Sequence, residues 1–139
     1  MPFKIQYNEE LGLFTLFGTG ELKLPDFARA RDRMVRHRAY EPSTDSIWEL
    51  DKASLQQTGS GVAQIVSLIS ARCADDGSGR VSIVLPKDLE PEFVKTMRVM
   101  AADAPTRFFV ARSNIDAGGW LQYQEDLDMD NHSPSSGLS

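Results

Sequence analysis

Residues Ser46 to Ala71 read SIWELDKASLQQTGSGVAQIVSLISA, and the rest of the chain can be organised around this stretch. The apolar run Ile47 to Leu50 predicts a buried strand, and the polar run Asp51 to Gln57 predicts a loop in which Leu55 is the apolar anchor. Thr58 to Gly61 then leads into residues with the apolar spacing of a helix. A strand, a loop and a helix in this order are half of a β-α-β unit, which indicates an α/β fold.

A β-hairpin is predicted at the start of the chain. Phe3 to Tyr7 alternates apolar and polar residues, and Leu11 to Phe17 is a second, more apolar run. The short connection between them favours an antiparallel pair. Gly18 and Gly20 are expected to end the second strand.

The first helix is predicted to begin within Leu24 to Phe27, with Pro25 near the first helical position. It is predicted to end near Tyr40, because Pro42 disfavours helical geometry in the residue before it. Arg31 and Arg38 fall inside the apolar face of this helix. Two interpretations follow. Their aliphatic stems could cover the sheet edge while the guanidinium groups reach solvent or an acid, or one of them could bind the anionic group of a ligand.

Two more strand-helix pairs follow the central stretch. Arg80 to Leu85 predicts a short buried strand, and a helix is expected from about Leu89 with Pro91 in its first turn. Arg107 to Ala111 predicts the last strand, after which Asn114 is expected to cap a short helix. The order is therefore a hairpin, a helix and three strand-helix units.

Consecutive strands joined by helices run parallel with right-handed crossovers. The sequence thus predicts one α/β domain over residues 1–123, with a mixed sheet of four or five strands whose first strand is antiparallel at an edge. Residues 124–139 are acidic and then rich in serine, a composition typical of a disordered tail.

Composition narrows the class of protein. The formal net charge of −5 argues against a nucleic-acid-binding protein that relies on a broad cationic surface. Cys73 is the one cysteine, which excludes disulfide frameworks and cysteine-based zinc sites. No apolar run approaches the roughly 20 residues of a membrane span, and the first residues lack the apolar segment of a signal peptide. We therefore expect a soluble, cytoplasmic protein.

Residues that could carry catalysis are sparse. The two histidines are His37, among the arginines of the first helix, and His132, in the tail, and neither follows a predicted strand. They lie too far apart in the sequence to indicate a metal cluster. Gly59-Ser60-Gly61 lacks the lysine of a P-loop and the third glycine of a dinucleotide fingerprint. The sequence predicts a non-enzymatic protein without a cofactor or metal.

Thr58 and Ser60 stand at the predicted amino end of a helix. Free N–H groups and the positive end of the helix dipole favour negative charge at such a position. The simpler interpretation is that one hydroxyl caps the helix while Gly59 and Gly61 permit the turn. The second interpretation adds a phosphate on one hydroxyl, stabilised by the same amides.

The succession of elements over residues 3–122 resembles the STAS domain, a family named for sulfate transporters and anti-sigma-factor antagonists. The likeness at sequence level is concentrated in residues 48–62. Family members have a buried strand that ends in an acidic or polar residue, a loop with one apolar anchor, and Asp-Ser-Ser-Gly-Leu-Gly at the helix start. Here Leu50-Asp51 ends the strand, and QTGSGV (residues 57–62) opens the helix. Gln57 stands where the family has Asp, and the loop is one residue shorter.

This resemblance implies a regulatory domain that binds other proteins. In the anti-sigma-factor antagonists, a partner kinase phosphorylates a serine at this helix start and thereby controls partner binding. The matching hydroxyl is that of Thr58, with Ser60 as the second candidate. The partner, a kinase or an anti-sigma-like regulator, would contact a loop formed by Asp51, Gln57, Gly59 and Gly61.

The resemblance also leaves an alternative function open. STAS-like domains include relatives suspected of binding lipid or other small apolar ligands. In this alternative the chain is a small-molecule or lipid-binding module with a pocket between the first helix and the sheet. Arg31 or Arg38 would then hold an anionic head group. The oligomeric state is not indicated by the sequence.

Overall fold

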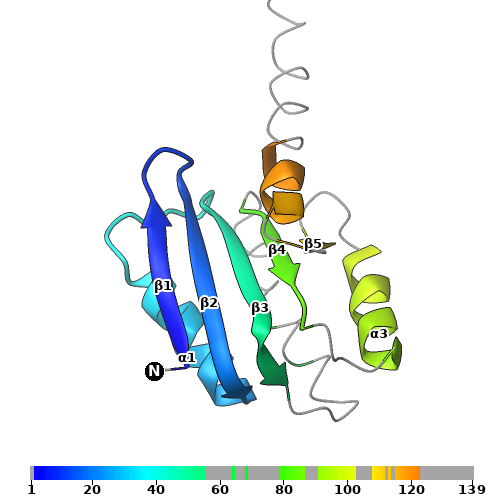
Figure 1. The fold of residues 1–139 in the computed structure, drawn as a ribbon. Helices are drawn as coiled ribbons and strands as arrows, with labels where there is room; N and C mark the ends of the chain where they lie inside the picture. The colour runs from blue at the N-terminus through cyan, green and yellow to red at the C-terminus, as the bar shows by residue number, and fades with distance from the viewer. Residues whose placement is uncertain are drawn as a thin grey trace, which may run out of the picture.

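The computed structural model describes residues 2–55, 64, 68, 79–86, 91–102, 108–111, 113 and 115–122. These residues form a five-stranded sheet with the strand order β1-β2-β3-β4-β5 (Figure 1). The elements are β1 (Phe3–Asn8), β2 (Leu13–Leu22), α1 (Leu24–Val35), β3 (Asp45–Leu55), β4 (Val81–Val84), α3 (Pro91–Ala102) and β5 (Phe108–Ala111). Residues 64 and 68 are helical, and residues 115–122 form a further helix.

The predicted mixed sheet with an antiparallel edge hairpin is confirmed. β1 lies at the edge and pairs antiparallel with β2, whereas β2, β3, β4 and β5 run parallel to one another. Gly12 closes the hairpin with a φ of +65°, a conformation that costs glycine little because it has no Cβ. The N–H of Gly12 donates to the carbonyl of Asn8 at 2.8 Å, which ties the turn to the end of β1.

The second and third strands are longer than the sequence predicted. β2 continues through Gly18 and Gly20 to Leu22, and β3 continues through Asp51 to Leu55. The expected strand end at Gly18 and the expected loop from Asp51 were therefore wrong over these residues. Both strands cross this region as a paired ladder in which Leu22 lies opposite Leu55.

A β-bulge explains the error. Phe17 pairs with Glu49 and Thr19 pairs with Lys52, so two residues of β3, Leu50 and Asp51, lie opposite Gly18 alone. In a regular strand, residues five positions apart point to opposite faces of the sheet. The extra residue shifts this alternation by one position, so Leu50 and Leu55 are both buried in the same core. The polar residues between them therefore do not show a strand pattern in the sequence.

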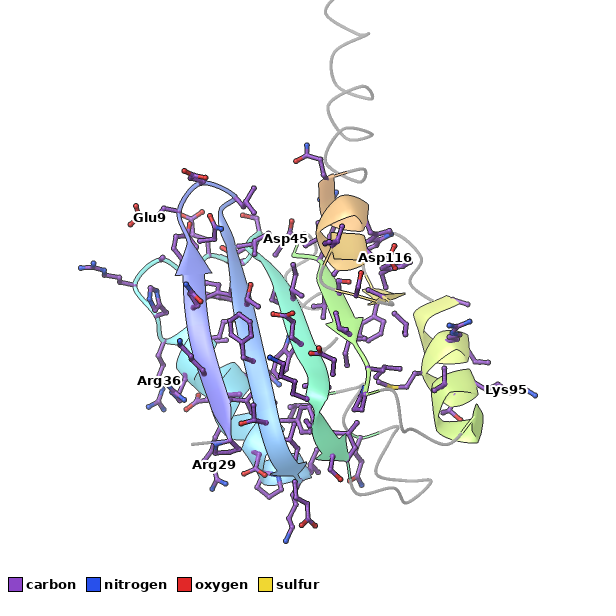
Figure 2. The ribbon with its side chains drawn as sticks, viewed as in Figure 1. Glu9, Arg29, Arg36, Asp45, Lys95 and Asp116 are labelled. Atoms are coloured by element: carbon purple, nitrogen blue, oxygen red, sulfur yellow. The ribbon has the colours of Figure 1, made fainter. Side chains whose placement is uncertain are left out.

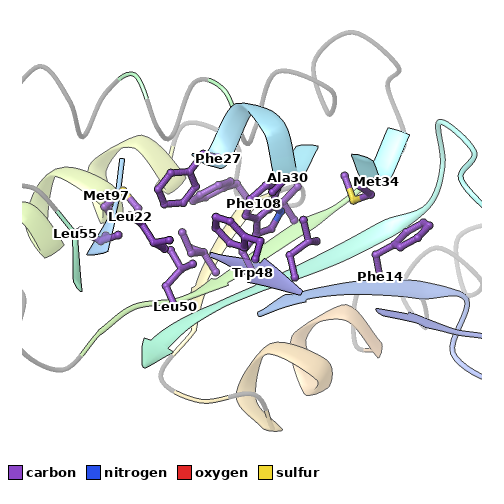
Figure 3. Packing of buried hydrophobic residues seen from close by; sticks show 14 residues of the cluster. Phe14, Leu22, Phe27, Ala30, Met34, Trp48, Leu50, Leu55, Met97 and Phe108 are labelled. Atoms are coloured by element: carbon purple, nitrogen blue, oxygen red, sulfur yellow. The ribbon is translucent and has the colours of Figure 1, made fainter. Parts of the chain in front are cut away.

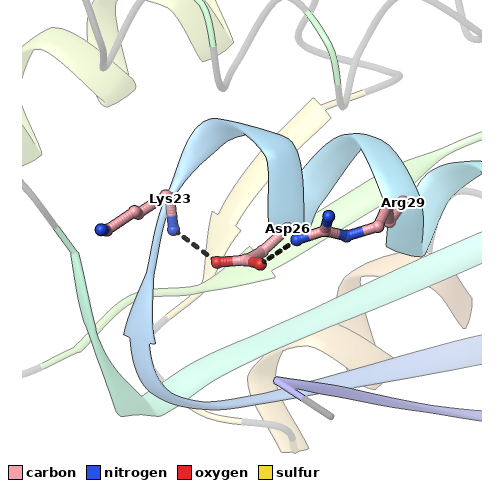
Figure 4. A network of polar contacts seen from close by, with 3 residues as sticks. All are labelled: Lys23, Asp26 and Arg29. Atoms are coloured by element: carbon pink, nitrogen blue, oxygen red, sulfur yellow. Dashed lines mark hydrogen bonds and ion pairs between the residues drawn. The ribbon is translucent and has the colours of Figure 1, made fainter.

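The first helix begins as predicted, with Pro25 in its first turn. The Asp26 carboxylate accepts a hydrogen bond from the backbone N–H of Lys23 at 2.9 Å and a second from Arg29 Nη2 at 2.8 Å (Figure 4). The bond from the Lys23 N–H, followed by that from Arg29, lowers the pKa of Asp26 below its ordinary value of 3.8. This carboxylate therefore stabilises the helix start in its charged form.

α1 ends at Val35, before the predicted end near Tyr40. Just beyond it, the N–H of Ala39 donates to His37 Nδ1 at 3.0 Å, and the N–H of Tyr40 donates to the His37 carbonyl at 2.9 Å. A bond from a side chain to the nearby backbone competes with the helical pattern and favours a turn. The turn around His37, rather than Pro42, thus ends the helix.

The main core lies between α1 and the sheet (Figure 3). Phe27 of α1 packs against Phe3 of β1, with ring centroids 5.3 Å apart, and against Trp48 of β3 at 6.1 Å. All three side chains are buried. The other fully or nearly buried members of this cluster are Phe14, Leu16, Leu22, Ala30, Met34, Leu50, Leu55, Val81, Ile83, Met97 and Phe108.

A smaller core covers the opposite face of the sheet. Helix 115–122 packs Ala117 and Leu121 against Leu13, Ile47 and Val84. Its first turn is capped by Ser113, whose Oγ accepts the N–H of Asp116 at 3.1 Å. Ser113 therefore has the capping role that the sequence assigned to Asn114, which lies outside the described residues. Within the part of the chain described, no helix is long and apolar enough to cross a membrane.

Candidate functional site

The central strand carries the chain to the carboxyl edge of the sheet. β3 is the third of five strands, and it runs parallel to β2 on one side and β4 on the other. It extends past its last pair with β4, Glu49 with Val84, and ends at Leu55. The chain is helical again at residues 64 and 68. The segment from residue 56 therefore leaves from the edge where α/β folds gather their ligands and partners.

The candidate phosphoacceptors belong to this segment. Thr58 and Ser60 lie outside the described residues, as do Gln57, Gly59 and Gly61 of the expected partner-binding loop. The described chain fixes where the segment starts and the helical state of residue 64. The predicted roles of these five residues stay predictions.

Asp51 was expected in the same loop but lies within β3, at the bulge. Its side chain is exposed. Four residues separate it from the end of the strand at Leu55, which corresponds to about 13 Å at the rise of an extended chain. Asp51 is therefore set back from the end of β3, and its expected position in a loop is corrected.

Arg31 and Arg38 are not brought together. Arg31 is half-buried on α1, and its Nη1 lies 3.5 Å from the carbonyl oxygen of Leu68, so it links α1 to the helical residues after β3. Arg38 is exposed and lies beyond the end of α1 at Val35. Its expected place on the apolar face of the helix was wrong, because the helix ends three residues before it.

Side chains fill the described interface between α1 and the sheet, where the alternative hypothesis placed a ligand pocket. Phe27, Phe3 and Trp48 are in mutual ring contact there, and Met34 is buried in the same cluster. The indole Nε1 of Trp48 is buried without a hydrogen-bond partner in the described structure. The packing weighs against a pocket at this position.

A hollow on the other face of the sheet was not predicted. It has a volume of about 590 Å³ and is lined by Gln6, Tyr7, Asn8, Thr15, Phe17 and Glu49. Gln6 pairs with Thr15, and Phe17 pairs with Glu49, so neighbouring strands contribute its floor. The polar residues at alternate positions of β1 were the signal in the sequence, but their neighbours on β3 could be identified only from the register. The lining is polar and contains one carboxylate.

No group of three or more metal-ligating His, Cys, Asp or Glu side chains is found among the described residues.

Comparison with known proteins identifies the type of fold. No family model and no curated protein matches this sequence. Among solved structures, it is similar to an uncharacterised protein of the DUF3478 family from Shewanella loihica PV-4, which is described as having a SpoIIAA-like fold. The TM-score is 0.55 at 14% sequence identity, and the match covers 86% of this chain and 91% of that chain. The chain thus has a SpoIIAA-like fold, which is the STAS-like fold, built from a divergent sequence.

Proposed function

We propose that this chain is a non-enzymatic regulatory domain that binds a protein partner at the helix start Thr58 to Gly61. The observation that carries the proposal is the course of β3. The strand ends at Leu55 on the carboxyl edge of the sheet, and the chain is helical by residue 64. In the STAS-like fold, this strand-to-helix connection is the segment that the anti-sigma-factor antagonists present to their partners.

Phosphorylation is the switch we propose for this contact. A phosphate on Thr58 or Ser60 would add about −1.5 to −2 charges at neutral pH. At a helix start it would lie against free N–H groups and the positive end of the dipole, so the modified chain would remain folded. The same charge would repel an acidic partner surface or recruit an arginine from it. The partner would be a kinase or an anti-sigma-like regulator.

The role of His37 supports a non-enzymatic assignment. Its ring stacks on Tyr7 with centroids 5.9 Å apart and meets the edge of Phe14 at 5.1 Å. Its Nδ1 accepts the N–H of Ala39, so this nitrogen is engaged in holding the turn after α1. The ring therefore has a structural role, at the end of the sheet opposite Leu55, where β3 ends.

Substitution of one hydroxyl residue by glutamate tests the proposal. Thr58→Glu should weaken capture of the partner from cells of the source organism, because it places a permanent charge at the contact. Ser43→Glu is the matched control, since Ser43 is exposed in the loop before β3, at the amino end of that strand. Partner capture that is equal for both variants would refute the proposed site.

The switch has a separate test. Intact-mass measurement of the chain purified from its source organism, followed by peptide mapping, should place a phosphate on Thr58 or Ser60. Thr58→Ala should remove the modification or move it to Ser60. A phosphate that maps elsewhere in the chain would contradict the switch and leave the partner site to be judged by the glutamate variants.

A further inference from the structure

The first helix and the turn after it carry a concentration of positive charge in an acidic chain. Residues 23–38 contain six basic side chains and two acidic ones, a formal charge of +4. The rest of the chain contains nine basic and eighteen acidic side chains, a formal charge of −9. We define the basic α1 surface as Arg29, Arg33, Arg36 and Arg38.

The geometry of α1 gathers three of these arginines on one side. Arg29, Arg33 and Arg36 follow the spacing i, i+4 and i+7, which places them along one stripe of a helix. The side chains of Arg29 and Arg36 are 71% and 78% exposed, and both project outward beside β1 (Figure 2). Arg33 reaches the edge strand itself, where its Nη1 donates to the Phe3 carbonyl at 3.2 Å.

Acids of the helix neutralise this surface only in part. Asp26 pairs with Arg29 at 2.8 Å, and Asp32 pairs with Arg36 at 3.3 Å. Each guanidinium has five N–H donors, so a single carboxylate leaves several of them to solvent or to another anion. The side chain of Arg38 is exposed and makes no ion pair with any described residue. The surface therefore retains donors and net positive charge for a further acidic group.

An acidic segment of the same chain begins nearby. Residues 125–130 read EDLDMD and carry four carboxylates, the same charge as residues 23–38 with the opposite sign. The described part of the helix before it runs to residue 122, and its Leu121 belongs to the same buried cluster as Leu13, the first residue of β2. The next residue, Phe14, faces the other way and contacts His37 and Tyr40, which flank Arg38. The start of the tail and Arg38 thus lie at the same end of the sheet, on its two faces.

The distance can be spanned. Each helix packs about 10 Å from the sheet, so α1 and helix 115–122 lie roughly 20 Å apart across it. Six extended residues, 123–128, reach up to about 20–22 Å, and eight, 123–130, up to about 26–29 Å. Asp128 and Asp130 are therefore the carboxylates within reach of the opposite face. Tethering also raises the local concentration of the acidic segment to the millimolar range, which lowers the affinity that docking requires.

We propose that the acidic segment 125–130 docks, through Asp128 and Asp130, on the basic α1 surface of its own chain. The tail then covers this surface at low ionic strength and competes with any other anionic group for it. The proposal is independent of the proposed function, because the basic α1 surface does not include the helix start at Thr58.

Paramagnetic relaxation in the full-length chain tests this docking. A spin label is attached at Ser133→Cys in a Cys73→Ala background, and the amide signals of the whole chain are recorded. Signals of residues 29–38 should lose most of their intensity at about 0.01 M salt. They should regain it at about 1 M, because the Debye length falls from about 30 Å to about 3 Å.

Two matched variants assign the contact. Arg36→Gln with Arg38→Gln should restore the signals at low salt. Lys95→Gln with Arg98→Gln removes the same charge from exposed positions of α3, which lies at the β5 edge of the sheet, and should change nothing (Figure 2). A label-free spectrum of the chain with Glu125, Asp126, Asp128 and Asp130 neutralised should show shifts at the same α1 amides.

Mixing the spin-labelled chain with unlabelled, isotope-enriched chain separates the two sources of contact. Docking within one chain predicts no signal loss in the mixture. Signal loss in the mixture would mean that the tail binds a second copy, which overturns the proposal. Loss at α3, or no loss at α1 in the labelled chain itself, would overturn it as well.

Discussion

Gly18→Ala should destabilise the chain, although alanine is usually the better residue in folded structure. Gly18 is buried at the bulge between β2 and β3. A Cβ at this position would lie 2.9 Å from Leu22 Cδ1, 3.0 Å from Leu50 Cδ2 and 3.0 Å from Phe3 Cε1. All three contacts are shorter than the normal van der Waals distance, so the neighbouring side chains must shift to accept the new methyl group.

The expected size follows from two opposing effects. An extra methyl group forced into a packed core costs about 1–3 kcal/mol. The loss of glycine's flexibility in the unfolded chain returns about 0.4–1 kcal/mol. The leucine ends can yield more easily than the Phe3 ring, which is held between Phe27 and Trp48. The difference is a net loss of about 0–2.6 kcal/mol in the free energy of unfolding, and the constrained Phe3 ring favours the upper half of this range.

Urea unfolding followed by circular dichroism measures this difference, and a chain of this size is suited to two-state treatment. Gly119→Ala is the control with the same chemical change. Gly119 lies in helix 115–122, and its Cβ would meet nothing within 4 Å. That variant should gain about 0.5–1 kcal/mol. If Gly18→Ala were as stable as the parent chain while Gly119→Ala gained stability, the packing at the bulge would be refuted.

Three more substitutions test the packing and the electrostatics of the fold. Because the folded pKa of Asp26 lies below 3.8, its stabilisation is complete above that pH and is lost as the pH falls through the folded pKa. Asp26→Asn should therefore lower stability at neutral pH and narrow the difference between neutral and acidic solution in pH-dependent urea unfolding; an unchanged pH profile would contradict this. Phe27→Ala should cost about 3–5 kcal/mol, because Phe27 is fully buried, and a loss below about 1 kcal/mol in urea unfolding would show that the site is not packed as described. Ser82→Ala should be neutral or stabilising, since its buried Oγ has no hydrogen-bond partner in the described structure; a clear loss in thermal unfolding would reveal a bond to this hydroxyl.

Much of the fold could be predicted from local sequence pattern. The short runs Ile47–Leu50 and Val81–Val84, each apolar at all but one position, are typical of strands buried on both faces, and both became inner strands of the sheet. Pro25 marked the start of α1 because its missing N–H costs nothing in a first turn. These signals lie within single elements, so they can be recognised without any knowledge of the tertiary structure.

The errors arose where tertiary contacts override local pattern. The bulge at Leu50-Asp51 breaks the period of two, so the second half of β3 had the composition of a loop. α1 ends in a turn around His37, whose bonds include that from the Ala39 N–H to His37 Nδ1, and no sequence pattern indicates this bond.

The candidate site divides in the same way. That the Thr58 segment follows β3 could be predicted from the order of elements. Parallel strands all have their carboxyl ends at one edge of the sheet, and the segment after β3 leaves from that edge. The place of Asp51 and the hollow lined by Gln6 and Glu49 depend on the strand register, which the sequence does not reveal. Arg38 was misplaced because its assignment assumed a longer helix.

Site-specific photocrosslinking in cells of the source organism tests the central claim most directly. A photoreactive residue at Gln57 should trap one discrete partner protein, and the crosslink should weaken when Thr58→Glu is added. The same residue at Ser43, exposed before the amino end of β3, should not trap that partner. A partner trapped equally at both positions, or trapped at Ser43 alone, would contradict a binding site at the carboxyl edge of the central strand.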